Sequence, residues 1–317
     1  MLIENVVKKN NRDYEEEKNI LLEFSQILKP YISLESIQKK LETNGFKGVY
    51  ILNDHLFKMV SSSENTLGIY SGENKAIILN RKDYIKNKSI GIHEMGHAYL
   101  DGSSSKEITL DDSIIIYGNG LEEAAMAIFQ CNLDIKNINK QFCNIYPYPS
   151  ILFKQLDILY KNSNCQKYDN LLIHLFMEPE TLIPLIRNIY EDIYTREMPC
   201  LDEELITKSA FYMISGIDTL VGYNDKLLYS LLCCMNSIYL NFIKTDVEKK
   251  EYNEIFFNLN DFRKTKEEIL LFKIFNSDIN YMKRLELNLK NILSSITERL
   301  EKFDNEENSK TKIIMPR

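Results

Sequence analysis

The sequence lacks an excess of positive charge. Its 46 acidic residues outnumber its 39 basic ones, which gives a formal net charge of −7. Proteins that bind nucleic acid carry dense basic patches because they must neutralise phosphates, and no such patch offsets the acidic balance here. The composition therefore argues against nucleic acid as the main partner.

Long uninterrupted apolar runs are also absent. The most apolar stretch is residues 227–243, and four polar residues interrupt it: Ser230, Asn236, Ser237 and Asn241. This stretch is expected to form a buried helix and not a membrane span. The amino-terminal residues hold no apolar segment of signal-peptide length and soon become strongly charged. These patterns predict a cytoplasmic protein that does not bind a membrane.

Cysteine pairs at regular spacing are missing as well. The chain has six cysteines, of which two are adjacent, Cys233 and Cys234, inside the apolar stretch. A disulfide framework or a cysteine-based zinc site would need paired spacings that recur along the chain. We therefore expect reduced and mostly buried thiols, as in a cytosolic protein.

Histidine is scarce, yet two of the four histidines lie close together in "GIHEMGHAYL", residues 91–100. Chance would place a His-Glu pair four residues before another histidine in about four of a thousand such chains. On a helix, His93, Glu94 and His97 share one face, and Gly96 leaves room for a packing partner. Two imidazoles at this spacing can bind one Zn²⁺, with the carboxylate as a base. The alternative is a solvated helix face with two surface histidines.

A catalytic zinc site needs a third protein ligand and an open fourth position. Downstream, "YGNGLEEAAMAIFQ", residues 117–130, predicts a glycine turn followed by a helix that begins with two glutamates. Glu123 lies opposite the apolar stripe of this helix and Glu122 lies on its flank, so Glu123 is the favoured ligand. Glu122 remains the alternative, and both can be ordinary first-turn acids. Asp101, one turn after His97, is a weaker alternative.

A His-Glu-x-x-His sequence followed by a helix that carries Glu resembles the zincin metallopeptidases, in particular the gluzincin branch that includes thermolysin. The resemblance covers residues 66–130. It implies one Zn²⁺ held by His93, His97 and Glu123, with Glu94 as general base. It also implies a peptide or protein substrate.

Two positions depart from this family. Thermolysin-like enzymes place an Asp four residues after the ligand Glu to hold a histidine, whereas this chain has Ala127, so another group must hold the ring or the site is weaker. Ser103 stands where metzincins have a third histidine, which excludes that branch. The residue that stabilises the oxyanion stays open among Tyr117, His174, Arg187, Tyr190, Arg196 and Tyr223.

The periodicity of apolar residues predicts an α+β fold. A small amino-terminal sheet and the two site helices form one part, residues 1–145, and a mostly helical part, residues 146–317, closes the cleft. Strands are expected at 48–52, 56–60, 66–70 and 75–80. The strand at 75–80 is the expected neighbour of the site. Other helices are expected at 14–28, 34–43, 150–162, 167–177, 181–194, 202–215, 226–243, 262–275 and 278–303, with a frayed tail after Lys302.

Taken together, these features predict a zinc-dependent metallopeptidase, and the composition is typical of an AT-rich bacterial genome. One alternative is a non-catalytic zincin-fold binding module or structural zinc protein. Another is a regulatory protease specific for one intracellular partner. The intact Glu94 favours catalysis, whereas Ala127 favours the non-catalytic alternative. The oligomeric state stays open.

Overall fold

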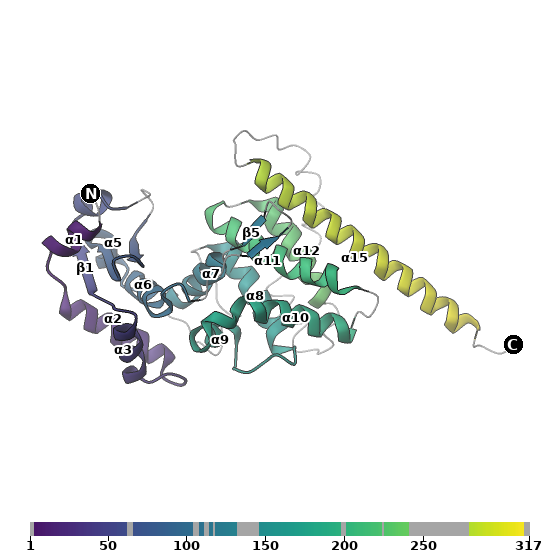
Figure 1. Cartoon of the computed structure of the whole chain (residues 1–317), viewed down its shortest axis with the longest axis horizontal. Coiled ribbons are helices and arrows are strands. Elements are labelled where there is room, and N and C mark those ends of the chain that lie inside the picture. Colours follow the sequence, from purple (N-terminus) through teal and green to yellow (C-terminus); the bar gives the residue numbers. More distant parts are fainter. Residues whose placement is uncertain are drawn as a thin grey trace. The chain divides into compact units, whose positions relative to one another are not determined.

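A computed structural model of the chain describes residues 3–61, 66–103, 108–110, 114–116, 118–131, 146–197, 201–223, 225–240 and 279–313. The chain divides into two compact units, which differ in their secondary structure. The sheet unit comprises Met1–Ser104 and Glu122–Ile145, and the helical unit comprises Ser105–Leu121 and Tyr146–Arg317. The expected α+β fold is therefore observed, with most of the chain helical (Figure 1).

A mixed three-stranded sheet forms the base of the sheet unit. Its strands are β1 (Gly48–Leu52), β2 (Gly68–Ser71) and β3 (Ala76–Asn80), in the spatial order β1-β3-β2. β3 runs parallel to β1 and antiparallel to β2. All five residues of β3 are buried. This agrees with its central position and its apolar sequence, since a strand covered on both faces has no polar side.

Six helices of the sheet unit surround this sheet, and a seventh, α7 (Asn119–Gln130), lies mostly in this unit. The six are α1 (Ile3–Lys9), α2 (Tyr14–Leu28), α3 (Leu34–Thr43), α4 (Asp54–Lys58), α5 (Arg81–Lys86) and α6 (Ser89–Leu100). The ring of Phe24 on α2 lies 5.9 Å from that of Tyr99 on α6 and 5.2 Å from that of Phe129 on α7. Helix α2 therefore packs both site helices into one apolar core.

The expected strand at 56–60 is wrong, because this segment forms most of helix α4. The side chain of Asn53 accepts a hydrogen bond from the backbone N–H of Leu56 at 2.9 Å, which caps the first turn. Phe57 then packs with Leu52 and Ile78 in the core. A short apolar run fits either a strand or a helix, and here the asparagine cap favours the helix.

The helical unit combines a two-stranded antiparallel ribbon with helices. The ribbon is β4 (Ile108–Leu110) and β5 (Ile114–Ile116). The helices are α8 (Pro147–Lys161), α9 (Leu171–Met177), the 3₁₀-helix η2 (Pro179–Thr181), α10 (Leu182–Glu197), α11 (Glu203–Gly222), α12 (Lys226–Leu240) and α15 (Ile279–Ile313). The sequence pattern predicted every described helix of this unit except the short η2.

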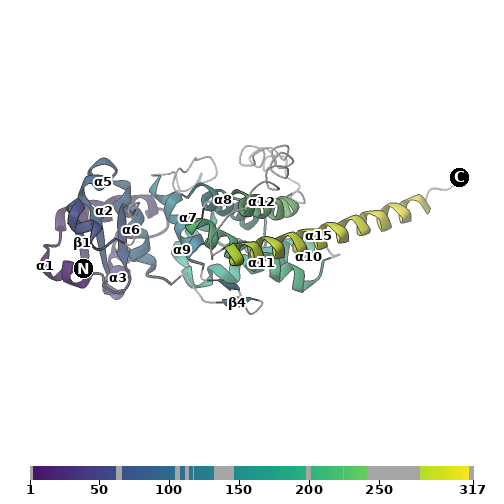
Figure 2. The ribbon, with the colours of Figure 1, turned by 90° about the horizontal axis from the view of Figure 1, so that it is seen from above.

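The long helix α15 packs along α11 and α12, and Figures 1 and 2 show it as one continuous rod. It buries Leu285, Leu289, Ile292 and Ile296, which recur at the spacing of one helical face. The expected fraying after Lys302 is wrong, since the helix continues to Ile313. The expected helix at 262–275 lies outside the described residues.

Helix α7 belongs to both units, because its first residues fall in the helical unit and Glu122 onward in the sheet unit. The carboxylate of Asp218 on α11 accepts hydrogen bonds from the backbone N–H groups of Gly118, at 2.9 Å, and Gly120, at 2.6 Å. A negative charge at a helix amino terminus complements the helix dipole. A Cβ atom on Gly120 would lie 2.5 Å from the Cα of Asp218, so this approach requires glycine.

No described helix combines the length and the apolar composition needed to cross a lipid bilayer. Cys131, Cys165, Cys233 and Cys234 are partly buried thiols that form no disulfide among the described residues. The other two cysteines, Cys143 and Cys200, lie outside the described residues.

Candidate metal centre

The two histidines of "GIHEMGHAYL" lie on α6, which is covered on nearly every side. This helix contacts α2, α3, α5, β2 and β3. From Ile90 to Leu100, every residue is buried except the half-buried His97. The surface-exposed face that the alternative interpretation of this motif requires is therefore absent. The polar side chains of α6 lie in the interior of the sheet unit.

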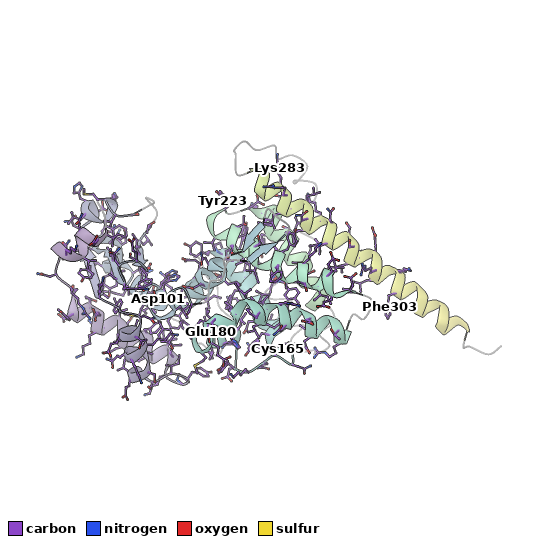
Figure 3. The ribbon with its side chains drawn as sticks, in the orientation of Figure 1. Asp101, Cys165, Glu180, Tyr223, Lys283 and Phe303 are labelled. Carbon is purple, nitrogen blue, oxygen red and sulfur yellow. The ribbon has the colours of Figure 1, made fainter. Side chains whose placement is uncertain are left out.

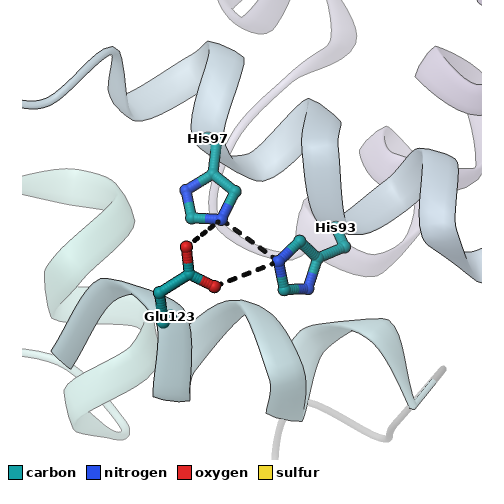
Figure 4. A group of neighbouring side chains, drawn as sticks. All are labelled: His93, His97 and Glu123. Atoms are coloured by element: carbon teal, nitrogen blue, oxygen red, sulfur yellow. Dashed lines mark hydrogen bonds and ion pairs between the residues drawn. The ribbon is translucent and has the colours of Figure 1, made fainter. Parts of the chain in front are cut away.

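Three predicted ligands meet in this interior (Figure 4). The Nε2 atoms of His93 and His97 lie 3.1 Å apart. One carboxylate oxygen of Glu123 lies 3.4 Å from the Nε2 of His93, and the other lies 3.4 Å from the Nε2 of His97. All three residues belong to the sheet unit. Their donor atoms form a group that can hold a metal ion.

Glu122 occupies a different position from its neighbour. Its Oε1 lies 2.7 Å from the Nδ1 of His97, the ring nitrogen that points away from Glu123 in Figure 4. The side chain is buried, with 6% of the residue exposed. Glu122 was the alternative ligand from the sequence, but its carboxylate is hydrogen-bonded to the rear of a ligand ring. The sequence did not predict this contact, although it did indicate that some group must hold a histidine.

The two histidines are supported unequally. The Nδ1 of His97 is hydrogen-bonded to Glu122, whereas the buried Nδ1 of His93 has no hydrogen-bond partner among the described residues. Position 127, where the zincin resemblance would place a supporting Asp, holds the fully buried Ala127 on α7. Within the described residues, Glu122 therefore supports His97 and the Nδ1 of His93 is left without support.

Glu94, the predicted general base, is buried against the edge of the sheet. It accepts a hydrogen bond from the backbone N–H of Tyr70 on β2, and burial raises the pKa of its carboxyl group. A Cβ atom on Gly68 would lie 2.9 Å from the side chain of Glu94, so glycine allows β2 to pack directly on it. Residues 75–80, which were expected near the site, do contact α6. Those residues form the central strand, and β2 contacts Glu94.

A polar cluster fixes the β2–β3 hairpin to the end of α6. The hydroxyl of Tyr70 donates to Asp101 at 2.6 Å, and the ammonium group of Lys75 lies 2.6 Å from the same carboxylate. Asp101, labelled in Figure 3, ends α6 in the left-handed conformation with φ of 48°. Its carboxylate is engaged by these two side chains and lies outside the group of metal-binding donors. This excludes the weaker alternative ligand.

The charges in the group are strongly coupled. Burial raises the pKa of Glu123, but hydrogen bonds from His93 and His97 outweigh burial and lower it below its usual value. Burial lowers the pKa of His97, but its hydrogen bonds to Glu122 and Glu123 raise that pKa well above its usual value. Among the described residues, no lysine or arginine pairs with Glu94 or Glu123. Buried carboxylates need a cation close by, which a protonated His97 or a metal ion would supply.

The two site helices pack closely at Gly96. A Cβ atom at this position would lie 2.0 Å from the Sδ of Met126 on α7. The sequence indicated that Gly96 leaves room for a partner, and Met126 is that partner. Because Glu122, Glu123 and Met126 share α7, this contact helps to set the distance between the glutamates and the histidines.

The predicted oxyanion-stabilising residues stay unassigned. Tyr117 lies outside the described residues, and Tyr223 is exposed over 46% of its surface (Figure 3). His174 and Tyr190 are buried within the helical unit, where they are hydrogen-bonded to Thr181 and Asn236. The remaining two form surface contacts in that unit: Arg187 with Glu203, and Arg196 with Asp192.

Comparisons of the chain with protein-family models, with curated proteins and with solved structures return no match. An inference about function therefore depends on the chemistry of the site itself.

Proposed function

We propose that this chain is a zinc-dependent metallopeptidase, with His93, His97 and Glu123 as metal ligands and Glu94 as general base. The observation that carries the proposal is the convergence of two imidazoles and one carboxylate from two helices on one point, with a further buried carboxylate beside them. A structural metal site has no need of that additional acid.

The donor set and its dimensions support zinc. Two histidines and one glutamate are a ligand set of catalytic zinc sites, which leave a fourth position open. Zn–N and Zn–O bonds of about 2.0–2.1 Å in a tetrahedral arrangement place neighbouring donors about 3.3–3.4 Å apart. The two Nε2 atoms lie 3.1 Å apart, and each lies 3.4 Å from a different oxygen of Glu123. Little rearrangement of the side chains is needed.

Glu94 has the position and surroundings of a general base. When bound, zinc supplies Lewis acidity, which polarises a carbonyl group and lowers the pKa of water to about 7. Glu94 accepts a proton from the attacking water and delivers it to the nitrogen of the departing amine. The N–H of Tyr70 holds one part of the carboxylate, and close packing by Gly68 restricts its rotamers. The base is thus oriented before substrate binds.

The strand β2 supports an extended peptide as substrate. It is the last strand in the order β1-β3-β2, so within the described sheet one of its edges is unpaired. An extended peptide can add to such an edge through main-chain hydrogen bonds, which depend little on its sequence. Since β2 also contacts Glu94, a peptide bound there would lie beside the base.

The test compares wild type with Glu94→Gln and with Glu73→Gln, an exposed acid in the β2–β3 turn as matched control. Zinc per chain is measured after dialysis, and hydrolysis is measured on unfolded proteins and on a library of quenched fluorescent peptides. Glu94→Gln should keep its zinc and lose at least about 10²-fold in turnover, since an amide cannot accept the proton. Glu73→Gln should match wild type in both.

Three results would count against the proposal in different ways. A wild-type protein without zinc affinity would overturn the metal centre. Zinc binding with near wild-type cleavage by Glu94→Gln would overturn the role of the base. Zinc binding with no cleavage of any protein or peptide would favour a non-catalytic zinc protein.

A further inference from the structure

We propose that Glu122 is the positioning residue of the metal centre, which holds His97 with its Nε2 atom turned toward His93 and Glu123. The inference rests on the metal centre of the proposed function and adds a residue that neither binds the metal nor takes part in proton transfer.

Glu122 is hydrogen-bonded to the ring of His97. The distance of 2.7 Å between the Nδ1 of His97 and the Oε1 of Glu122 is typical of a charge-assisted bond. A carboxylate is an acceptor only, so the ring proton lies on Nδ1 and the lone pair on Nε2. That tautomer is the one in which Nε2 can bind a metal ion. Glu122 therefore fixes both the tautomer and the rotation of the ring.

Glu122 and Glu123 are adjacent residues of the same helix, α7. Successive residues of an α-helix point about 100° apart, so Glu122 and Glu123 leave α7 in different directions. One reaches Nδ1 of His97 and the other faces its Nε2, at 2.7 and 3.4 Å. Both ring nitrogens are thus engaged by the same rigid element. A movement of α7 shifts ligand and support together.

His93 differs from His97 in the environment of its Nδ1 atom. Its Nδ1 is buried and has no hydrogen-bond partner among the described residues, and the family's position for a supporting acid holds Ala127. Carboxylate support of this kind typically changes metal affinity by 10–100-fold. In this chain, such support acts on the second histidine of the motif. Loss of Glu122 should therefore affect His97 and leave His93 unchanged.

The experiment measures affinity for zinc alone, by competition with a chromophoric chelator. The variants are Glu122→Ala, which removes the acceptor, and Glu122→Gln, which keeps a weaker one at almost the same size. Glu122→Ala should lower affinity about 10–100-fold, and Glu122→Gln about fivefold, because a neutral acceptor is weaker by roughly 1 kcal/mol. The control is Glu17→Gln, which removes another partly buried acid of the sheet unit, paired with Arg12. It should leave zinc affinity unchanged.

A spectroscopic measurement separates positioning from a general loss of structure. The chain has only four histidines, so ¹⁵N-labelled rings can be followed one by one in the zinc-loaded protein. In wild type, the Nδ1 proton of His97 should exchange slowly with solvent. In both Glu122 variants it should exchange faster, with His93 unchanged and both Nε2 atoms still bound to zinc.

The outcomes distinguish this inference from the proposed function. No zinc binding by wild type overturns the metal centre, and the inference with it. Zinc binding by wild type with affinity within twofold of it in Glu122→Ala overturns the positioning role alone. An equal loss in Glu17→Gln also overturns it. If Glu122→Gln loses all zinc while Glu123→Gln keeps it, then Glu122 is a ligand and the assignment is wrong.

Discussion

The two units each contain buried histidine, but they satisfy it in different ways. His174 in the helical unit has a partner on each ring nitrogen: its Nδ1 lies 3.3 Å from the hydroxyl of Tyr160, and its Nε2 lies 2.9 Å from the hydroxyl of Thr181. In the sheet unit, the Nε2 atoms of His93 and His97 face each other and a carboxylate. Both ring nitrogens of His174 are hydrogen-bonded, whereas the Nε2 atoms of His93 and His97 are directed at a common point.

The partners of His174 determine its tautomer. The hydroxyl of Tyr160 accepts the backbone N–H groups of Lys167 and Tyr168, each at 2.8 Å, so its own proton is directed to the Nδ1 of His174. His174 then carries its proton on Nε2 and donates to Thr181, which donates to the carbonyl of Glu178. Every donor in this series of hydrogen bonds has an acceptor, and the imidazole ring of His174 is neutral. Burial lowers the pKa of His174, in agreement.

Burial alone therefore does not mark a histidine as a metal ligand. A histidine whose two nitrogens are satisfied by hydroxyl groups stabilises a core and has no lone pair to offer. A pair whose nitrogens converge without a matching donor can accept a metal ion. Four experiments on the two groups of residues test this distinction.

The largest effect is expected on metal content. His93→Ala and His97→Ala should each lose most bound zinc, because two ligands at one helical spacing have no local replacement. His174→Ala should retain one zinc per chain. Elemental analysis after dialysis measures this. Stoichiometric zinc in a double variant of His93 and His97, or its loss in His174→Ala, would end the distinction.

His174→Ala should instead destabilise the protein by about 2–4 kcal/mol, from the cavity and the unpaired hydroxyl groups of Tyr160 and Thr181. Denaturant unfolding followed by a probe in the helical unit measures the change. His55→Ala, at an exposed position of α4, is the control and should change stability by less than about 0.5 kcal/mol. Equal effects of the two variants would show that the hydrogen bonds of His174 contribute little.

Zinc at one hundred times its dissociation constant should stabilise the sheet unit by about 2.7 kcal/mol, since only the folded state offers all three ligands. The increment should persist in His174→Ala and vanish in His97→Ala. Gly96→Ala should lose part of it, because the added methyl group meets Met126 and overpacking costs about 1–3 kcal/mol. Thermal unfolding with and without zinc measures all three variants. A full increment in His97→Ala contradicts the assignment.

The smallest effect concerns pH. The pKa of His174 is lower in the folded than in the unfolded chain, so protons bind the unfolded chain first as the pH falls. The stabilising contribution of His174 is complete above a pH of about 6.5 and declines below it. The difference in stability between zinc-loaded wild type and His174→Ala should therefore narrow from pH 7 to pH 5. A difference that widens would contradict a neutral ring.

The sequence predicted those features of the site that depend on local geometry. His93 and His97 share a face of one helix at any orientation of that helix, and a Glu beside the first remains beside it. Glu123 was favoured by the periodicity of a single helix, and it lies in the cluster. The strands β1 and β3 were found because apolar residues are continuous there.

Features that depend on packing between distant segments could not be predicted. A helix rotated by one residue exchanges Glu122 and Glu123, and only the position of α6 decides which of them faces Nε2. The strand that contacts Glu94 depends on the pairing order, in which β3 is central although β2 precedes it in the sequence. The absence of an exposed face on α6 follows from the five elements around it, which a helical wheel does not contain.

The course of α7 limits how the protein can be dissected. All proposed ligands lie within residues 1–145, so a fragment with these residues would contain every ligand of the proposed zinc site. It would lack Asp218, however, and with it the carboxylate that holds the N–H groups of Gly118 and Gly120 just before the glutamates. The first turn of the ligand helix would begin uncapped. The ligands lie in one stretch of sequence, but the helix that carries Glu123 depends on a residue outside that stretch. A transplant of this site must therefore include part of α11.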